Sequence, residues 1–336
     1  MILPINLGEQ SYNIIVERGA LAKIGSFLNL ERKVLILTDS GVPAEYSKRV
    51  LDACKDGYIY TVEQGEKSKS FDNYSAILAF MVKNAFTRTD CVVCVGGGVC
   101  GDLGGFVAAS YMRGIDFYNV PTTLLSQVDS SIGGKVAIDF EGVKNIVGAF
   151  YQPKAVVIDP NTLKTLDKRQ VNAGLCEAIK MACTCDRELF ELIEKSEDFE
   201  KDIDEIIVRS LKIKGNVVEI DPKEKGLRKV LNFGHTIGHA VESDNSLKEL
   251  LHGECVAIGM MPMCSADVKS RLKKVLEKYS LPTEAKSDAD TLISYITRDK
   301  KAKGDKITII FVRAIGTFEM RDVMINDLKE YINGGI

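Results

Sequence analysis

The chain has 336 residues, 45% of them hydrophobic and 27% charged, which is enough for two domains that each bury a core. A net charge of −3 and a pI near 5.8 give no overall attraction to nucleic acid, so we expect no nucleic-acid partner. With no recognisable signal peptide and no apolar run long enough to cross a bilayer, we expect a cytoplasmic protein without a membrane partner.

The first half of the chain alternates between strand and helix patterns. After a hairpin over residues 3–7 and 12–17, helices are expected at 42–55 and 71–84 and strands at 33–39, 58–62, 91–95, 115–120 and 155–159. Such alternation predicts a mainly parallel sheet that binds ligands beyond the carboxyl ends of its strands. Residues 1–160 are therefore expected to form an α/β, Rossmann-like domain.

A glycine-rich segment, GGGVCGDLGG at residues 96–105, follows the third of these strands and leads into a helical stretch at 106–111. Glycines let a backbone approach a phosphate, and the N-terminus of a following helix favours its charge. The spacing is not that of the G-x-G-x-x-G motif, and such segments also serve packing alone. The position after a strand favours a site for a dinucleotide pyrophosphate, with Asp39 at the end of the first αβ-unit strand suited to a ribose hydroxyl.

Helical periodicity dominates the second half, which is expected to form an all-α domain over residues 161–336. The helices are predicted at 171–184, 187–196, 203–221, 230–243, 254–267, 270–279 and 290–299. A late hairpin over residues 306–312 and 317–321 interrupts this pattern. Nine cysteines, an odd number without a secretory signal, favour reduced thiols.

All three histidines of the chain, His235, His239 and His252, fall within one short stretch. On a helix His235 and His239 share a face, so the group can hold zinc or a similar ion, with one histidine to spare. The alternative is that the three are ordinary helix and turn residues. Glu177 and Lys180 lie one turn apart on an apolar helix, where the carboxylate serves either as a metal ligand or in an internal ion pair.

The residues resemble the 3-dehydroquinate synthase family of sugar-phosphate cyclases, in the shikimate pathway to chorismate and the aromatic amino acids. The matching segments cover nearly the whole chain: GEKSK (65–69), GGGVCGDLGGF (96–106), YMRG (111–114), PTTLLSQVDSSIGGK (121–135), KNIVGAFYQP (144–153), GLCEAIK (174–180), LRKVLNFGHTIGHAVE (227–242), HGE (252–254) and DKK (299–301). The resemblance implies an NAD-binding α/β domain followed by a helical metal-binding domain.

The resemblance also implies a set of site residues. Zinc, or cobalt, would be held by Glu177, His235 and His252, leaving His239 as a catalytic residue. NAD would be contacted by Asp39, Glu66, Lys69, Gly97, Gly98, Asp102, Thr122, Thr123 and Lys144. Substrate would be held by Asp129, Lys135, Asn145, Lys180, Lys214, Arg228, Asn232 and Lys300, the last chosen over Lys301. Arg113 would reach across the interface of a homodimer to the partner's substrate phosphate.

The implied reaction is that of a phosphate-eliminating lyase, which converts 3-deoxy-D-arabino-heptulosonate 7-phosphate (DAHP) to 3-dehydroquinate. A hydroxyl is oxidised transiently by bound NAD, phosphate is eliminated, the ketone is reduced again, and an aldol step closes the ring. Three alternatives remain: a cyclase for a neutral sugar phosphate that makes an inosose or a valiolone, a metal- and NAD-dependent polyol or glycerol phosphate dehydrogenase, and an inactive relative that acts as a binding subunit. Lys214, Arg228 and Asn232 favour a substrate with a carboxylate.

Overall fold

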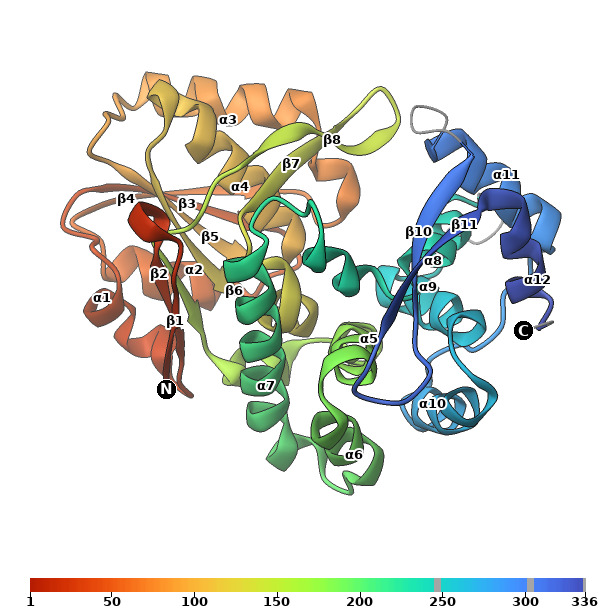
Figure 1. The fold of residues 1–336 in the computed structure, drawn as a ribbon. Coiled ribbons are helices and arrows are strands. Elements are labelled where there is room, and N and C mark those ends of the chain that lie inside the picture. Colours follow the sequence, from red (N-terminus) through yellow and green to blue (C-terminus); the bar gives the residue numbers. More distant parts are fainter. Residues whose placement is uncertain (245–248, 301–304, 335–336) are drawn as a thin grey trace. The chain divides into compact units, whose positions relative to one another are not determined.

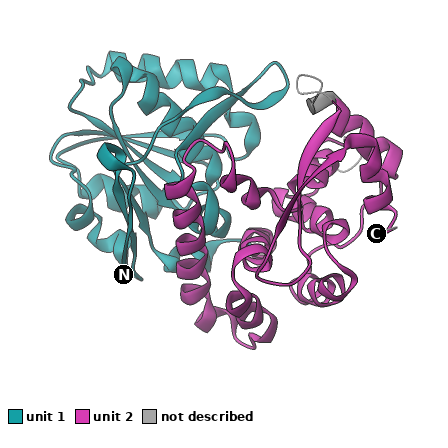
Figure 2. Cartoon of the chain, in the orientation of Figure 1, with its two compact units in different colours: residues 1–167 teal, residues 168–336 magenta. Residues whose placement is uncertain are grey.

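The chain forms two compact units, residues 1–167 and 168–336 (Figure 2). The computed structural model describes residues 1–244, 249–300 and 305–334. The division falls at Asp167, whereas the sequence placed the boundary near residue 160.

A seven-stranded sheet in the order β1-β2-β9-β6-β5-β3-β4 forms the centre of unit 1 (Figure 1). Its strands are parallel except for the β1–β2 hairpin, which confirms the mainly parallel sheet expected from the sequence. The strands are β1 (Ile2–Ile5), β2 (Tyr12–Val16), β3 (Lys33–Asp39), β4 (Asp56–Val62), β5 (Cys91–Gly96), β6 (Asp116–Pro121) and β9 (Ala155–Ile158). The helices of this unit are α1 (Ile24–Phe27), α2 (Ala44–Asp52), α3 (Phe71–Lys83) and α4 (Gly98–Ser110).

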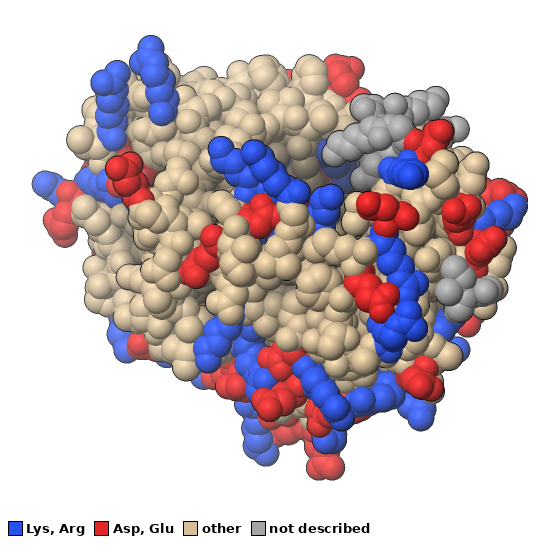
Figure 3. Space-filling model, viewed as in Figure 1, with Lys and Arg blue, Asp and Glu red and all other residues tan. Residues whose placement is uncertain are grey.

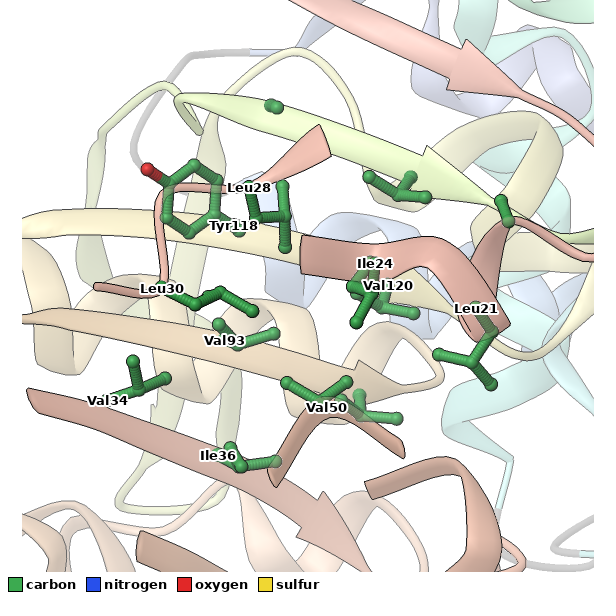
Figure 4. Packing of buried hydrophobic residues seen from close by; sticks show 14 of the residues in the cluster. Leu21, Ile24, Leu28, Leu30, Val34, Ile36, Val50, Val93, Tyr118 and Val120 are labelled. Atoms are coloured by element: carbon green, nitrogen blue, oxygen red, sulfur yellow. The ribbon is translucent and has the colours of Figure 1, made fainter. Parts of the chain in front are cut away.

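Both faces of this sheet are buried, which explains why its strands are apolar at successive positions rather than at alternate ones. Val34 and Ile36 of β3 join one core cluster with residues of α1 and α2 (Figure 4). Leu35 and Leu37 point to the opposite face and join a second cluster with residues of α3 and α4. The sheet is thereby fixed as a rigid platform for the loops that follow its strands.

A second hairpin, β7 (Lys135–Phe140) and β8 (Val143–Phe150), was not predicted from the sequence. Its two turn residues, Glu141 and Gly142, have positive φ angles of 49° and 76°. Positive φ at both central positions is the requirement of a type I′ hairpin turn, which is usually signalled by Asn-Gly or Asp-Gly. Glu-Gly signals such a turn only weakly, which explains why the sequence predicted no hairpin here.

Helix α4 begins at Gly98, within the glycine-rich segment, whereas the sequence placed helical structure at residues 106–111. Two of the glycines have a packing role. A Cβ atom at Gly104 would lie 2.4 Å from Sγ of Cys94, and one at Gly105 would lie 2.4 Å from Cγ1 of Val136. Larger residues would push the helix away from β5 and β7, so only the start of the segment stays available for a ligand.

Unit 2 is mainly helical, with one hairpin of β10 (Lys306–Phe311) and β11 (Glu319–Met324). Its helices are α5 (Lys168–Cys185), α6 (Arg187–Lys195), α7 (Phe199–Ile220), α8 (His235–Ser243), α9 (His252–Met260), α10 (Ala266–Lys278), α11 (Ala289–Lys300) and α12 (Leu328–Ile332). Most of the expected helices are present within a few residues of their predicted ends. The late hairpin also forms, although β11 starts two residues after the predicted position.

The helix predicted over residues 230–243 is instead broken. Residues 227–232 form the 3₁₀ helix η7 (Leu227–Asn232), and α8 starts at His235. Between them Gly234 has a φ of +78°, and a Cβ there would lie 2.8 Å from the carbonyl oxygen of Val256. The break places His235 at the first turn of its helix rather than in the middle of one.

Among residues 1–244, 249–300 and 305–334, no helix is long and apolar enough to cross a membrane. Figure 3 shows Lys and Arg side chains interspersed with Asp and Glu over the face in view. This mixture agrees with the small net charge of the chain.

Candidate active site

Close packing of three helices builds the centre of unit 2. A Cβ atom at Gly253 would lie 1.9 Å from the carbonyl oxygen of Ala173 in α5, and one at Gly238 would lie 3.0 Å from that of Cys255 in α9. These glycines therefore let α8 and α9 approach each other and let α9 approach α5 (Figure 1). The first residues of α8 and α9, His235 and His252, come to lie beside the middle of α5.

Glu177 of α5 lies beside both of these histidines. Its Oε1 atom is 3.8 Å from Nε2 of His235 and 3.6 Å from Nε2 of His252. Its Oε2 atom is 2.5 Å from Nζ of Lys180, and both of these side chains are almost fully buried. The carboxylate thus faces two imidazole nitrogens on one side and an ammonium group on the other.

This arrangement fits a tetrahedral metal ion. Zinc bonds of about 2.0–2.2 Å place the atoms of two ligands roughly 3.4 Å apart, close to the separations observed here. The ring of His239 is 5.2 Å from that of His235 and 5.8 Å from that of His252, centroid to centroid. One ligand atom from each histidine lies within 4.8 Å of the others, so three histidines are an alternative donor set. His239 is exposed, whereas Glu177 is buried and supplies negative charge, which favours Glu177 as the third ligand.

The pKa values of the two half-buried histidines, His235 and His252, shift in opposite directions. Burial, together with Lys180 and the other two histidines, lowers the pKa of His235 well below its ordinary value, so this ring is neutral. Burial also opposes the charge on His252, but Glu242 and Glu177 outweigh it and raise the pKa of this ring. Neutral imidazole is the form that binds a metal, so His235 is prepared for ligation.

Other predicted substrate residues of unit 2 are also buried cations or their neighbours. Lys214 of α7 and Arg228 of η7 are 6% and 3% exposed. Arg228 donates from Nη1 to the carbonyl oxygen of Pro222 at 2.8 Å. Asn232, at the end of η7, donates from Nδ2 to Oε1 of Glu224 at 2.7 Å. Lys300 is the last residue of α11, and its side chain, like the whole of Lys301, lies outside the described residues.

In unit 1, Lys69 joins several of the predicted site residues. Its Nζ atom lies 3.2 Å from Oε1 of Glu66 and 2.9 Å from Oδ2 of Asp102, and it also donates to Oδ1 of Asn145. Burial opposes the charge of Lys69, but Asp102 and Glu66 outweigh it and raise its pKa. Asn145 has a φ of 54° and donates its backbone N–H to Asp139 where the β7–β8 pairing is irregular. Such an irregularity redirects a side chain, here toward Lys69.

The predicted dinucleotide residues gather at the carboxyl ends of β3, β5 and β6. Asp39 ends β3, and its two carboxylate oxygens accept from the N–H of Gly41 and the thiol of Cys100. Gly97 precedes α4, and a Cβ there would lie 3.1 Å from Cγ2 of Thr123. Thr122 donates its N–H to the carbonyl oxygen of Gly96, which ties the loop after β6 to the end of β5. A backbone cradle at a helix N-terminus results.

The remaining predicted residues occupy more separate positions. Asp129 lies in a π-helical turn (Ser126–Ser130). Lys135 starts β7 and lines a small pocket with Asp102 and Ser131. Lys144 is exposed on β8. Gly97 precedes the N-terminal end of α4 and Arg113 follows its C-terminal end, so a helix about 20 Å long separates them. Met112 and Arg113 both have positive φ, 49° and 70°, so a strained turn presents the exposed Arg113.

Two residues beside the site were missed from the sequence. Glu242 accepts from Nδ1 of His252 at 3.2 Å, and Glu224 accepts from Asn232. Glu242 is seven positions after His235 and three after His239, a spacing that places it on the same helix face. Glu224 carries no such signal, because it lies in a loop organised by Asp221, which accepts from the backbone N–H groups of Lys225 and Gly226.

Solved structures share this fold over the whole chain. A 2-deoxy-scyllo-inosose synthase, complexed with carbaglucose-6-phosphate, NAD⁺ and Co²⁺, matches with a TM-score of 0.87 at 24% identity and covers 100% of both chains. The 2-epi-5-epi-valiolone synthase of Streptomyces hygroscopicus, with NAD⁺ and Zn²⁺ bound, matches with a TM-score of 0.87 at 25% identity over 98% of both chains. A probable glycerol dehydrogenase from Sinorhizobium meliloti matches less well, with a TM-score of 0.62.

Relatives identified by sequence are more similar to this chain than the solved structures are. The 3-dehydroquinate synthase of Lactococcus lactis is 41% identical, with 99% of both chains covered, and that of Clostridium beijerinckii is 40% identical, with 94% of this chain and 95% of the relative covered. The family models for the N-terminal and C-terminal parts of 3-dehydroquinate synthase match residues 59–173 and 174–302. The resemblance drawn from the sequence motifs is confirmed, and the chain belongs to the 3-dehydroquinate synthase family.

Proposed function

We propose that this chain converts DAHP to 3-dehydroquinate and phosphate, with NAD bound by unit 1 and a zinc or cobalt ion held by Glu177, His235 and His252 of unit 2. The observation that carries the proposal is the Glu177 carboxylate, which lies within 4 Å of both imidazole nitrogens and of the Lys180 ammonium. Relatives at about 40% identity over the whole chain support the reaction. Related structures with NAD⁺ and Co²⁺ or Zn²⁺ support the cofactors.

When bound, the metal ion supplies Lewis acidity to a substrate hydroxyl, and NAD supplies a reversible hydride acceptor. Lys180 holds one oxygen of Glu177 and leaves the other directed at the two histidines. Because a buried ammonium group also attracts anions, the same Lys180 can contact an oxygen of the substrate. His239, exposed beside the other two rings, is the candidate for moving a proton to or from the substrate.

The dinucleotide would be held by the residues gathered at the strand ends of unit 1. Asp39 accepts from a ribose hydroxyl, and the backbone of Gly97 and Gly98 at the start of α4 receives the pyrophosphate. Lys69 fixes Glu66 and Asp102 in place beside it. The proposed contacts of Thr122, Thr123 and Lys144 complete the set.

DAHP carries two anionic groups, and the chain offers a separate set of cations and donors for each. Lys214, Arg228 and Asn232 would bind the carboxylate, since guanidinium and ammonium groups form charge-assisted hydrogen bonds with it. Lys135, Asn145 and a partner's arginine at position 113 would bind the phosphate. Asp129 and Lys300 complete the proposed substrate set.

A homodimer forms part of this proposal. Arg113 sits on a strained turn at the far end of α4 from Gly97 and Gly98. Within its own chain the length of α4 separates Arg113 from Gly97 and Gly98, so the strained turn has a use if it presents Arg113 to another protomer. A cytoplasmic location is also part of the proposal, since all nine cysteines are free thiols, as a reducing compartment keeps them.

Substrate choice tests the proposal against the other sugar-phosphate cyclases. Purified protein with NAD and zinc is offered DAHP, glucose 6-phosphate or sedoheptulose 7-phosphate, and the cyclic product is identified by mass spectrometry. We expect 3-dehydroquinate from DAHP and no product from the two sugar phosphates that lack a carboxylate, because the buried cations Lys214 and Arg228 would then have no anion to bind. An inosose or a valiolone as the main product would overturn the proposal.

A further inference from the structure

We propose that Glu242 is a positioning residue for the metal site: it holds the ring of His252 so that Nε2 faces the ion, and it strengthens metal binding. This inference rests on the proposed ligand set of Glu177, His235 and His252. It assigns a function to a carboxylate that the reaction itself does not use.

The geometry of His252 carries the inference. Nδ1 of its ring lies 3.2 Å from Oε2 of Glu242, and Nε2 lies 3.6 Å from Oε1 of Glu177. A ring that donates its Nδ1–H to a carboxylate has an unprotonated Nε2, which is the atom a metal ion binds. Glu242 belongs to α8 and His252 to α9, so this contact also links the two helices that supply the histidine ligands.

His235 is oriented differently. Its Nδ1 atom lies 3.3 Å from the carbonyl oxygen of Phe233, two residues earlier in the chain. That partner is part of the backbone and is neutral, whereas the partner of His252 is a side chain with a full negative charge. A charged acceptor raises the basicity of the ligand ring more than a neutral one does.

The charges around the site give Glu242 a second effect. The negative charge of Glu177 is offset by the ammonium group of Lys180 at 2.5 Å. Both histidines bind a metal as neutral rings, so the ligand set with Lys180 has no net negative charge to offset a divalent ion. Glu242, in contact with Nδ1 of His252, places a carboxylate one imidazole ring away from the ion.

Zinc affinity of the metal-free protein tests the inference without NAD, substrate or activity. Competition with a chromophoric chelator measures the zinc dissociation constant of the parent and of three variants. We expect Glu242→Ala to weaken zinc binding by about 10–100-fold. Glu242→Gln keeps a hydrogen-bond acceptor without the charge, so its zinc dissociation constant should lie between those of the parent and of Glu242→Ala. The control is Ser243→Ala on the same helix, whose hydroxyl donates to the backbone of His239 and which should bind zinc like the parent.

A double-mutant cycle shows whether Glu242 acts through His252. In a His252→Ala background, Glu242→Ala should cause little further loss of zinc affinity, because the ring that it positions is gone. An unchanged dissociation constant in Glu242→Ala, or an equal loss in both backgrounds, would overturn the inference. Failure of the proposed metal site gives a different result, since His252→Ala alone would then leave zinc affinity unchanged.

Discussion

The proposed chemistry of this chain depends on single residues that occupy positions which packing alone would fill with apolar groups. Glu177 and Lys180 are each 1% exposed and lie on α5 among buried neighbours such as Cys176 and Ile179. Burying an ion pair commonly costs more than a hydrophobic pair of similar volume would. This cost is understandable where the carboxylate is kept for a metal ion and the ammonium group for a substrate.

The choice of the third ligand leads to the first prediction. Glu177→Gln should lose stoichiometric zinc, since a neutral amide binds zinc poorly and offsets none of its charge. His239→Ala should keep its zinc and lose turnover by about 10²–10⁴-fold, the usual contribution of a general acid or base. Metal analysis after dialysis, together with turnover, checks both variants. Zinc loss in the His239 variant with retention in the Glu177 variant would favour the three-histidine set.

The sequence revealed the kinds of ligand but not all of their partners. Three histidines in a short stretch pointed to a metal because histidine is otherwise missing from the chain. The contact between Glu242 and His252 depends on how α8 meets α9, and the contacts of Lys69 with Asp102 and Asn145 join three separate elements. No spacing along the chain encodes such distances between elements.

Among the elements, α9 depends on close contact with α5. Gly253→Ala would place a methyl group 1.9 Å from a backbone oxygen of α5, which only movement of a helix can relieve. We expect a loss of about 1–3 kcal/mol in the free energy of unfolding, together with weaker zinc binding, because His252 moves with α9. The matched change Gly25→Ala, whose new atom meets Ala53 at 3.5 Å, should leave both quantities near those of the parent. Urea unfolding and chelator competition measure them, and equal behaviour of the two variants would contradict the packing role.

The junction of α6 and α7 gives a pH-dependent prediction. Asp186 accepts from the N–H of Leu189 at the start of α6 and from two nitrogens of Arg209 in α7. Burial opposes its charge, but these partners outweigh it and lower the pKa of Asp186. A carboxyl group with a lowered pKa stabilises the fold at pH values above its ordinary pKa, and this contribution is lost as the pH falls through the lowered value.

Asp186→Asn keeps a good helix cap and removes the ion pair. At pH 7 we expect it to unfold at a lower urea concentration, with a loss of about 1 kcal/mol because the pair is partly exposed. The difference in stability from the parent should narrow as the pH falls below about 4, where Asp186 of the unfolded parent begins to take up a proton while the folded protein still resists it. A difference that stays constant down to about pH 3 would show that the charge of Asp186 is unimportant.

Elements were predictable where one pattern dominated. The buried strands β3 and β5 are apolar at every position from Val34 to Leu37 and from Cys91 to Val95, which sufficed to place them. The β7–β8 hairpin was missed because its turn is Glu-Gly, and the helix over residues 230–243 was overextended because Gly234 breaks it in response to α9. The hairpin was missed because the local sequence signals its turn weakly. The helix was extended too far because its break depends on a tertiary contact.

At the scale of the whole molecule, the chain consists of two units with complementary sets of residues. Unit 1 carries the predicted dinucleotide residues and unit 2 the predicted metal ligands, an order of domains that the alternation of patterns along the sequence already predicted. The proposed homodimer adds a further level, because Arg113 would act on the substrate of another protomer. Neither the dimer nor this contribution follows from local patterns in the sequence.

Mixing two inactive variants tests the exchange of Arg113. Arg113→Ala and Lys180→Ala should each have very low activity alone. In a hybrid dimer the Lys180→Ala protomer supplies Arg113 to its partner, whose own Lys180 is intact, so one of the two sites works. Equal mixing after unfolding and refolding should restore about a quarter of parent activity, because half of the dimers are hybrid. No recovery, although hybrids form by size and mass analysis, would place Arg113 in the site of its own chain.

The most direct test of the proposed cyclase reaction follows inorganic phosphate and NADH absorbance at the same time, with DAHP, NAD and the zinc-loaded protein. Because the hydride taken in the first step is returned in a later one, we expect phosphate to be released through many turnovers without lasting NADH. NADH that accumulates in proportion to substrate consumed would identify a dehydrogenase instead. It would contradict the proposal that this chain is a phosphate-eliminating cyclase.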